Sequence, residues 1–186
     1  MRVGIHQPNF VPHFGFFYKM SMCDVFVILS QVQFEKNGFQ NRYRFAKWPA
    51  DKWVTMPVNG GLEPIKDKRY TNGLRLDEVN MQFITWAKEV LSIETRLVRD
   101  VVTNARSTQR LIDNLNYYGA TTYVTNPSAK DKYLDEAALK AAGIDIEYSS
   151  HVNERKNILE MFEEYGIEGT RKQLWRPKRE PAKLDG

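Results

Sequence analysis

The sequence has little cysteine and little histidine: one cysteine, Cys23, and three histidines in 186 residues. A single cysteine excludes a disulfide within the chain and a zinc site built from several cysteines. Because it directly precedes an apolar run, Cys23 is expected to be a small core residue. No apolar run approaches the length of a membrane span, and no signal-like segment opens the chain. These absences predict a cytoplasmic protein with no membrane contact.

Several catalytic motifs are also missing. The sequence has no Walker-type glycine-rich loop, no GxSxG elbow, no HExxH and no GxGxxG. Hydrolase triads, zinc proteases and nicotinamide enzymes therefore have no support, and neither a metal site nor a cofactor is predicted, although the sequence leaves room for a divalent cation. The formal net charge of +4 permits a polyanionic partner such as DNA without requiring one.

The length of the chain suits one domain with its own hydrophobic core. Residues 1–168 are predicted to form a single α/β domain. Residues 169–186 are predicted to form a basic, proline-interrupted C-terminal tail. Basic residues around Trp175 in that tail suit a nucleic-acid backbone and a stacked base, whereas a solvated tail is the simpler alternative.

Apolar runs at Val3–Ile5 and Val25–Leu29, with a short helix expected at Gly15–Met22 between them, predict a βαβ unit. The fold class expected is a three-layer α/β protein with a mostly parallel sheet, flanking helices and a β-hairpin insertion. Leu62–Asp77 is expected to be a long loop near the site. The other expected strands are Gln40–Phe45, Trp53–Val58, Thr121–Thr125 and Ile144–Tyr148. The other expected helices are Val79–Asn104, Ser107–Tyr118, Ala129–Ala142 and Glu154–Tyr165.

Polar side chains gather where the first two strands end. His6 and His13 flank a loop with prolines, close to Gln7 and Asn9, and Gln33 follows the second strand. Ligands of βαβ units bind beyond the carboxyl ends of the strands. The residues alone leave open whether the two histidines belong to a site or only to the fold.

Two further groups of residues suit an anion. The first contains Gln33, Lys36, Asn41, Arg42 and Arg44. If Gln40–Phe45 is a strand, Arg42 and Arg44 share one face, where two guanidiniums repel each other unless an anion or a carboxylate lies between them. A solvated charged face is the alternative.

The second group is the turn that contains Ser128 and Lys130. Ser128 and Asp131 have the spacing of a capping box, which would put Lys130 in the first turn of a helix, where the macrodipole disfavours a cation. A bound anion would relieve that conflict, and a solvent-facing Lys130 is the alternative. We predict that the histidine loop, the two arginines and this turn converge on one cleft.

Five segments of the sequence, in this order, resemble the WbqC-like family. They are IHQPNFVPHFGFF, DVFVILSQVQFEKNGFQNRYR, WVTMPV, YGATTYVTNPSAKDKYLDE and AGIDIEY. The resemblance reaches to about Tyr148. The chain departs from the family at Ser30-Gln31, where an acidic pair is often found, so that a metal or general-base role for such a pair is not expected.

The resemblance implies a transferase that attaches an amino acid, with glycine the first candidate, to an activated acceptor. The acceptor would be phosphorylated hydroxymethyluracil in phage DNA or a sugar in surface-polysaccharide (O-antigen) synthesis. The implied partners are an amino acid and a phosphorylated acceptor, and a phage-encoded enzyme would act in the host cytoplasm. His6 or His13 would be the catalytic base. The implied substrate-binding residues are Gln7, Asn9, Gln33, Lys36, Asn41, Arg42, Arg44, Ser128 and Lys130.

Two alternatives remain. The run His13-Phe14-Gly15-Phe16 is similar to the HxGH loop of nucleotidylyltransferases, with phenylalanine in place of the second histidine. The other alternative is a non-catalytic protein that binds phosphate or DNA in the same pocket.

Overall fold

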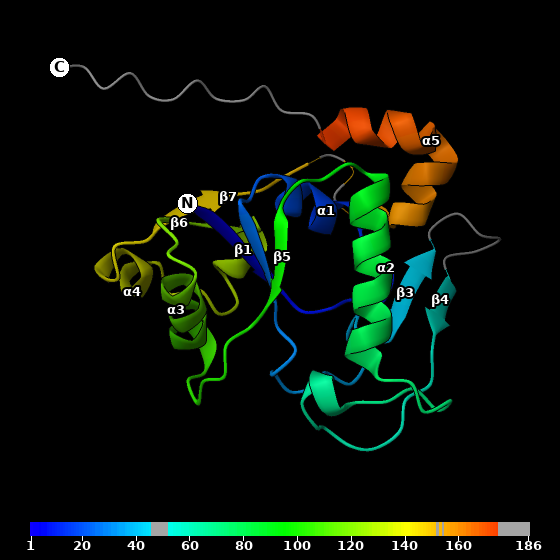
Figure 1. Cartoon of the computed structure of the whole chain (residues 1–186), viewed down its shortest axis with the longest axis horizontal. Coiled ribbons are helices and arrows are strands. Elements are labelled where there is room, and N and C mark those ends of the chain that lie inside the picture. The colour runs from blue at the N-terminus through cyan, green and yellow to red at the C-terminus, as the bar shows by residue number, and fades with distance from the viewer. Residues whose placement is uncertain (46–51, 152, 154, 175–186) are drawn as a thin grey trace.

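The computed structural model describes residues 1–45, 52–151, 153 and 155–174. The chain folds around a five-stranded sheet of order β5-β2-β1-β6-β7 (Figure 1), in which every neighbouring pair is parallel. Its strands are β1 Arg2–His6, β2 Val25–Ile28, β5 Arg96–Arg99, β6 Thr122–Thr125 and β7 Asp145–Tyr148. The predicted α/β fold is confirmed.

Helices cover both faces of the sheet and give the predicted three layers (Figure 1). One face is covered by α1 Phe14–Ser21, α2 Leu76–Val90 and α5 Ile158–Leu174. The other face is covered by α3 Ser107–Tyr117 and α4 Glu136–Ala141. Each face has its own apolar cluster: Phe14, Phe17 and Ile84 belong to the first, and Leu115 and Leu139 to the second. The sheet is therefore buried on both sides, as parallel sheets are.

The predicted hairpin is also present. β3 Arg42–Phe45 and β4 Lys52–Thr55 pair antiparallel and stand apart from the main sheet. The predicted long loop before α2 contains a short 3-10 turn, η1 Ile65–Asp67, and it is anchored by an apolar cluster. That cluster consists of Phe34, Ile65, Tyr70 and Leu76.

Cys23 is buried, as predicted. A Cβ on Gly4 of β1 would lie 2.7 Å from its Sγ and 2.8 Å from the Phe26 ring, so the core around β1 leaves no room for a side chain at Gly4. Burial raises the pKa of the Cys23 thiol to about 12, which makes it unreactive at neutral pH.

The single helix predicted over Val79–Asn104 is wrong. Helix α2 ends at Val90, and Ser92 then adopts a left-handed conformation with φ 55° that turns the chain back toward the sheet. The following residues form β5, an edge strand. Ile93 and Leu97 happen to continue the three- and four-residue spacing of the helix, although Leu97 packs on one face of the sheet and Val98 on the other.

The helix predicted over Ala129–Ala142 is also wrong at its start. Pro127–Ala129 forms only a 3-10 turn, η2, and α4 begins at Glu136. The cap is Asp135, whose Oδ1 accepts a hydrogen bond of 3.0 Å from the Ala138 N–H, so the capping box predicted at Ser128 does not form.

Helix α5 starts later and ends later than the predicted Glu154–Tyr165. It kinks at Gly166, with φ 65°, and its second half buries Thr170 and Leu174. Regular structure therefore crosses residue 168, where the tail was predicted to start. Trp175 and the rest of residues 175–186 lie outside the described residues, so the predicted division into domain and tail stays a prediction.

Candidate functional site

A cleft of about 480 Å³ opens at the carboxyl ends of the central strands. The chain runs outward from β1 to β2 and β5, then crosses through α3 to β6 on the other side of β1. Neighbouring strands at which the order reverses form a switch point, where α/β proteins bind ligands. The cleft is lined by Ile5, His6, Gln7, Leu29, Val32, Glu35, Ser107, Arg110, Leu111, Tyr123, Lys132 and Tyr133.

His6 ends β1 and is half-buried at the cleft. Its Nδ1 lies 3.0 Å from the Gln7 carbonyl oxygen, which only accepts, so Nδ1 carries the proton and Nε2 is the acceptor. Its ring meets Phe16 edge-on, with 5.0 Å between centroids. Burial, together with the nearby charge of Lys19, lowers the pKa of His6 to about 3. The imidazole is therefore neutral at physiological pH.

Lys19 of α1 is one cause of the lowered pKa of His6. It is buried, and its Nζ donates a hydrogen bond of 2.9 Å to the carbonyl oxygen of Ile5, the residue before His6. Burial lowers the pKa of Lys19 to about 8, still above neutrality. A cation thus lies directly behind the end of β1.

Arg110 of α3 brings a fixed guanidinium to the cleft. Its Nε donates to Ala105 O at 3.0 Å and its Nη2 to Thr103 O at 3.1 Å. The third nitrogen, Nη1, is buried without a hydrogen-bond partner among the residues that the structure describes. A buried, unpaired donor of a charged group is costly, and an anion would satisfy it.

Two carboxylates near Arg110 are already engaged. Asp113 accepts from Thr103 Oγ1 at 2.5 Å and from Gln109 at 2.9 Å. Asp100 accepts from the backbone N–H groups of Ser30 and Gln31 at 3.0 and 3.1 Å. Asp100 therefore places a carboxylate beside the position at which the sequence departs from the family pattern, and burial raises its pKa.

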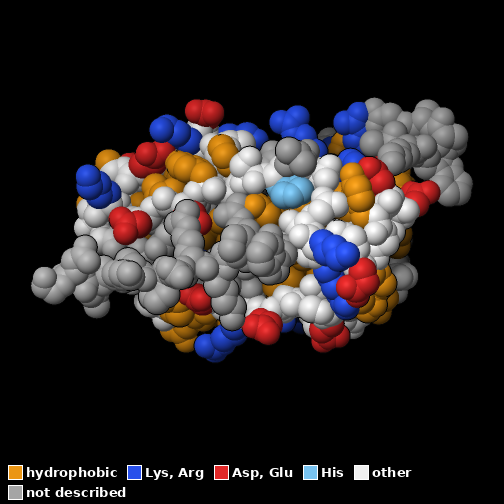
Figure 2. Space-filling view, turned by 90° about the horizontal axis from the view of Figure 1, so that it is seen from above, with side chains coloured by type: hydrophobic (Ala, Val, Ile, Leu, Met, Phe, Trp, Pro, Cys, Tyr) orange, Lys and Arg blue, Asp and Glu red, His pale blue; other side chains and the backbone are white. Residues whose placement is uncertain are grey.

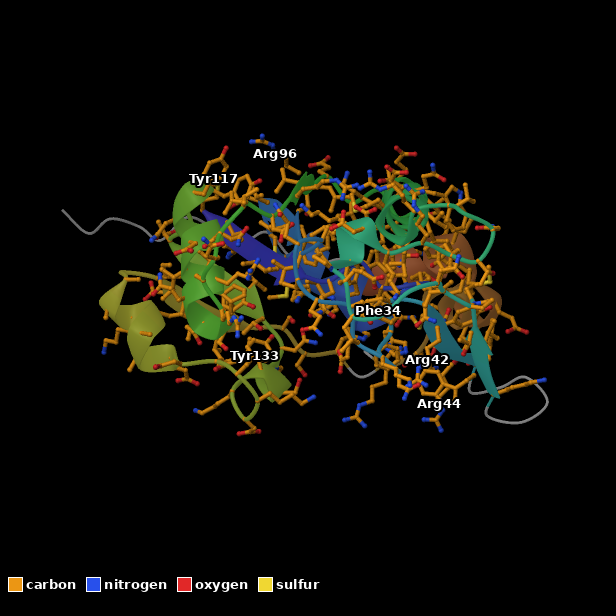
Figure 3. All side chains as sticks on the ribbon, turned by 90° about the horizontal axis from the view of Figure 1, so that it is seen from below. Phe34, Arg42, Arg44, Arg96, Tyr117 and Tyr133 are labelled. Carbon is orange, nitrogen blue, oxygen red and sulfur yellow. The ribbon has the colours of Figure 1, made fainter. Side chains whose placement is uncertain are left out.

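Other residues of the cleft add strain and charge. Ser107, the first residue of α3, has φ 47°, a left-handed conformation that a serine rarely adopts. Lys132 and Tyr133 are exposed on the turn before α4. Figure 3 shows Tyr133 at one side of this edge of the molecule and Arg42 and Arg44 at the other.

Gln7 connects the cleft to the segment before the hairpin. Its Oε1 accepts a hydrogen bond of 2.5 Å from Gln40 Nε2. The buried Asn80 of α2 donates to Pro8 O at 2.8 Å and to Gln40 O at 2.7 Å, and it accepts from Tyr70. The loop after β1 is thereby held against the segment that leads into β3.

His13 lies outside the residues that line the cleft. It is the N-cap residue of α1, its backbone bridges to Asn157 before α5, and its ring meets Phe39 edge-on at 5.1 Å. Burial lowers the pKa of His13, and the Glu160 carboxylate opposes that shift. The third histidine, His151, packs against Phe14 and Tyr18 of α1.

Arg42 and Arg44 do lie on one face of β3, as predicted from the strand. Arg42 pairs with Thr55 and Arg44 with Trp53, and side chains opposite each other in antiparallel strands share a face. The Arg42 guanidinium stacks on the Trp53 ring at 4.2 Å, and its Nη2 donates to Asn37 O. Neither arginine lines the cleft.

The remaining predicted residues also lie outside the cleft lining. Asn41 is buried, and its amide donates to Met56 O at 2.8 Å within the hairpin. Lys130 pairs with Glu136 at 3.2 Å, and Ser128 is exposed in η2. Asn9 is half-buried, whereas Gln33 and Lys36 are exposed. Of the predicted site residues, the cleft thus contains His6 and Gln7, and the cations in it are Arg110 and Lys132 instead of Lys130 and the hairpin arginines.

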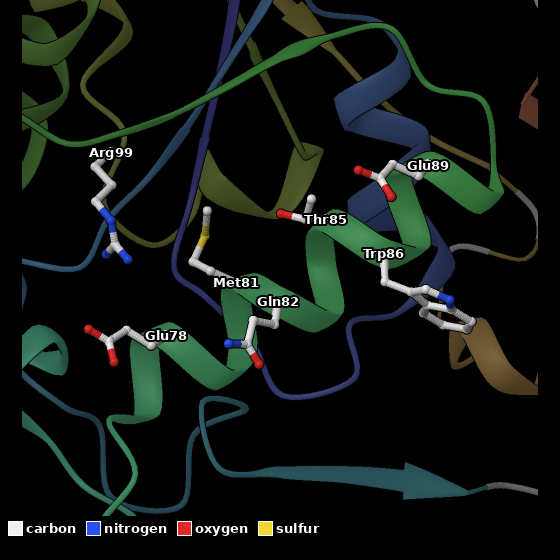
Figure 4. A pocket seen from close by; sticks show the side chains of 7 residues that line it. All are labelled: Glu78, Met81, Gln82, Thr85, Trp86, Glu89 and Arg99. Atoms are coloured by element: carbon white, nitrogen blue, oxygen red, sulfur yellow. The ribbon is translucent and has the colours of Figure 1, made fainter.

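Two other hollows are less suited to chemistry. A groove of about 460 Å³ on the outer face of α2 contains Glu78, Trp86 and Arg99 (Figure 4), and Arg99 is committed to the buried Asp77. A pocket of about 720 Å³ lies beside the loop before β5 and includes Cys23. The face in Figure 2 intersperses positive and negative side chains, without a patch of one sign in the described part that it shows.

The chain belongs to the WbqC-like protein family, whose model matches residues 7–74 and 63–163. It is also similar to the uncharacterized protein Rv1507c of Mycobacterium tuberculosis (strain ATCC 25618 / H37Rv), with 24% identity over 189 residues that cover 78% of this chain and 80% of the relative. No solved structure matches the chain.

Two negative findings apply to the described residues alone. No helix in them is both long and apolar enough to cross a membrane. No group of three or more histidine, cysteine, aspartate or glutamate side chains in them is arranged to hold a metal ion.

Proposed function

We propose that this protein is a transferase that joins an amino acid to a phosphorylated acceptor in the switch-point cleft. The family is associated with transferase activity, which supports the class of reaction. One observation carries the location: the same cleft is lined by a neutral imidazole, His6, and by Arg110, whose guanidinium has an unpaired nitrogen. The amine of an amino acid and the phosphate of an acceptor need these two kinds of group.

The proposed reaction is a substitution at the carbon that bears the phosphate. The amine nitrogen attacks that carbon, a C–N bond forms, the C–O bond breaks, and the phosphate leaves with the electron pair. Arg110 and Lys132 would stabilise the leaving phosphate through charge-assisted hydrogen bonds. The neutral amine loses one proton in this step. The phosphate can take it up, because the acceptor phosphate is mostly a dianion at pH 7 and would leave as a strongly basic trianion.

His6 fits a different role from the base expected from the sequence. A group with a pKa of about 3 is a weak proton acceptor at neutral pH. Its unprotonated Nε2 can instead accept a hydrogen bond from the attacking amine and so direct the nitrogen lone pair at the acceptor carbon. Gln7, held by Gln40, would orient the same substrate.

The finer proposal follows the family resemblance. The amino acid is glycine, and the acceptor is phosphorylated hydroxymethyluracil in DNA, with an O-antigen sugar as the second acceptor to test. The protein would be incubated with isotopically labelled glycine and either acceptor, and the products would be analysed by mass spectrometry. We expect the acceptor to gain glycine and lose phosphate.

Two variants test whether the reaction takes place in the cleft. Arg110→Met should weaken use of the phosphorylated acceptor about tenfold or more, the scale of a lost hydrogen bond to a charged group. Arg96→Met removes an exposed arginine of β5 and should leave the reaction unchanged. Absence of product with both acceptors, or an Arg110→Met variant as active as the parent protein, would refute the proposal.

A further inference from the structure

The hairpin and the segment that leads into it present two large aromatic side chains to solvent. Phe39 and Trp53 are each 40% exposed. Their rings lie 5.6 Å apart, and Phe39 in turn meets His13 at 5.1 Å. The Arg42 guanidinium lies 4.2 Å from the Trp53 ring. We call Phe39, Trp53 and Arg42 the hairpin platform.

The two exposed rings of the hairpin platform lie outside the hydrophobic core. The opposite face of the hairpin is the one that reaches the core, where Tyr43 lies 5.5 Å from Phe10 and 5.2 Å from Phe45. Phe39 and Trp53 belong to none of the apolar clusters. Two neighbouring aromatic rings that are each partly exposed form a small apolar surface on which a planar ligand can stack.

The positive charge beside the rings limits the kinds of ligand that fit the platform. No carboxylate of the described residues forms an ion pair with Arg42, and its Nη2–H bond to Asn37 O fixes the guanidinium over Trp53. The Arg42 Nε is buried without a partner among the described residues. Arg44 stands on the same face, two residues along β3. Planar rings alternating with cations match a chain of planar bases joined by phosphates.

We propose that the hairpin platform binds a single-stranded segment of nucleic acid, with bases stacked on Phe39 and Trp53 and a phosphate at Arg42. Stacking on aromatic side chains accepts any base, so the platform holds a strand without reading its sequence. The hydrogen bond from Gln40 to Gln7 joins the segment before the hairpin to the cleft, so a strand on the platform would lie near the cleft. The proposal concerns binding and does not depend on the transfer reaction.

Fluorescence anisotropy with a labelled oligothymidylate of about ten nucleotides, within the range that such surfaces bind, tests the platform. Trp53→Ala and Phe39→Ala should each weaken binding about tenfold or more. Trp53→Phe keeps a ring and should retain most of the affinity, which separates loss of stacking from damage to the hairpin. Trp86→Ala is the matched control, because Trp86 is 46% exposed on α2 (Figure 4) and should not affect binding.

Salt dependence tests the phosphate contact. Arg42→Ala should reduce the slope of log affinity against log salt by about 0.7, the value for one phosphate of a single strand. Arg96→Ala, on the opposite side of the view in Figure 3, should leave the slope unchanged.

Three outcomes would refute the proposal that the hairpin platform binds a single strand of nucleic acid. They are no binding of the parent protein at low salt, equal binding by the Trp53→Ala and parent proteins, and displacement of the strand by an uncharged oligosaccharide. The last would assign the rings to a sugar. The two proposals can fail separately: Trp53→Ala should still transfer glycine to a phosphorylated mononucleoside, and Arg110→Met should still bind the oligonucleotide.

Discussion

Acidification should destabilise the fold through His6. The unfolded imidazole has its ordinary pKa of 6.5, whereas the pKa of folded His6 is lowered to about 3. Between these values only the unfolded state takes up a proton, so the contribution of His6 is fully present above pH 6.5 and is lost as the pH falls toward 3. From pH 7 to pH 4 the loss is about 3 kcal/mol, because one pH unit in this window corresponds to about 1.36 kcal/mol. This is an upper bound, since the side chain is only half-buried.

Urea unfolding at pH 7 and pH 4 measures the effect. The parent protein should lose more free energy of unfolding over this interval than His6→Gln, by up to about 3 kcal/mol. His13 has the same direction of pKa shift, but it is present in both proteins and cancels in the comparison. An equal loss in both proteins, or an NMR titration of His6 near pH 6.5, would refute the reasoning.

Three further predictions concern single substitutions. Asp135→Ala should lower the free energy of unfolding by about 1 kcal/mol in urea, because it removes the N-cap of α4, and Asp135→Asn should restore most of it. Ser92→Gly should raise it by up to about 1 kcal/mol, because Ser92 has φ 55° after α2, whereas Ser92→Ala should not. Lys19→Met should raise the pKa of His6, measured by NMR, because it removes a cation that lowers it; an unchanged pKa would contradict this.

The first βαβ unit could be predicted because its signals are local. Val3–Ile5 and Val25–Leu29 are apolar runs, and the prolines at positions 8 and 12 mark the loop after the first run. β5 could not be predicted in the same way. Its apolar residues continue the spacing of α2, and its identity depends on Ser92 turning the chain and on β2 being available to pair.

The candidate site was predictable only in part, for a related reason. His6 and Gln7 directly follow a strand, so their place at the carboxyl edge of the sheet follows from the strand itself. Arg110 lies inside a helix, and its position in the sequence is typical of a solvent-exposed residue on the polar side of that helix. Its two acceptors, Thr103 O and Ala105 O, belong to a loop whose path the sequence does not indicate. Lys130 and Lys132 are two residues apart. The misplaced start of the helix, together with the family resemblance, made Lys130 the predicted residue.

Three departures from ordinary local structure occur in one cleft, although they belong to distant parts of the chain. His6 is a histidine held neutral, Ser107 has a left-handed backbone, and Arg110 has a buried donor without a partner. The left-handed Ser107 and the unpaired donor of Arg110 cost free energy at neutral pH. Strain and unpaired polar groups persist where the surrounding fold imposes them, and they gather at sites that bind ligands. A ligand whose phosphate meets Arg110 and whose amine meets His6 would recover part of that cost, which is why the cleft, and not the more numerous surface cations, is the place to look for the reaction.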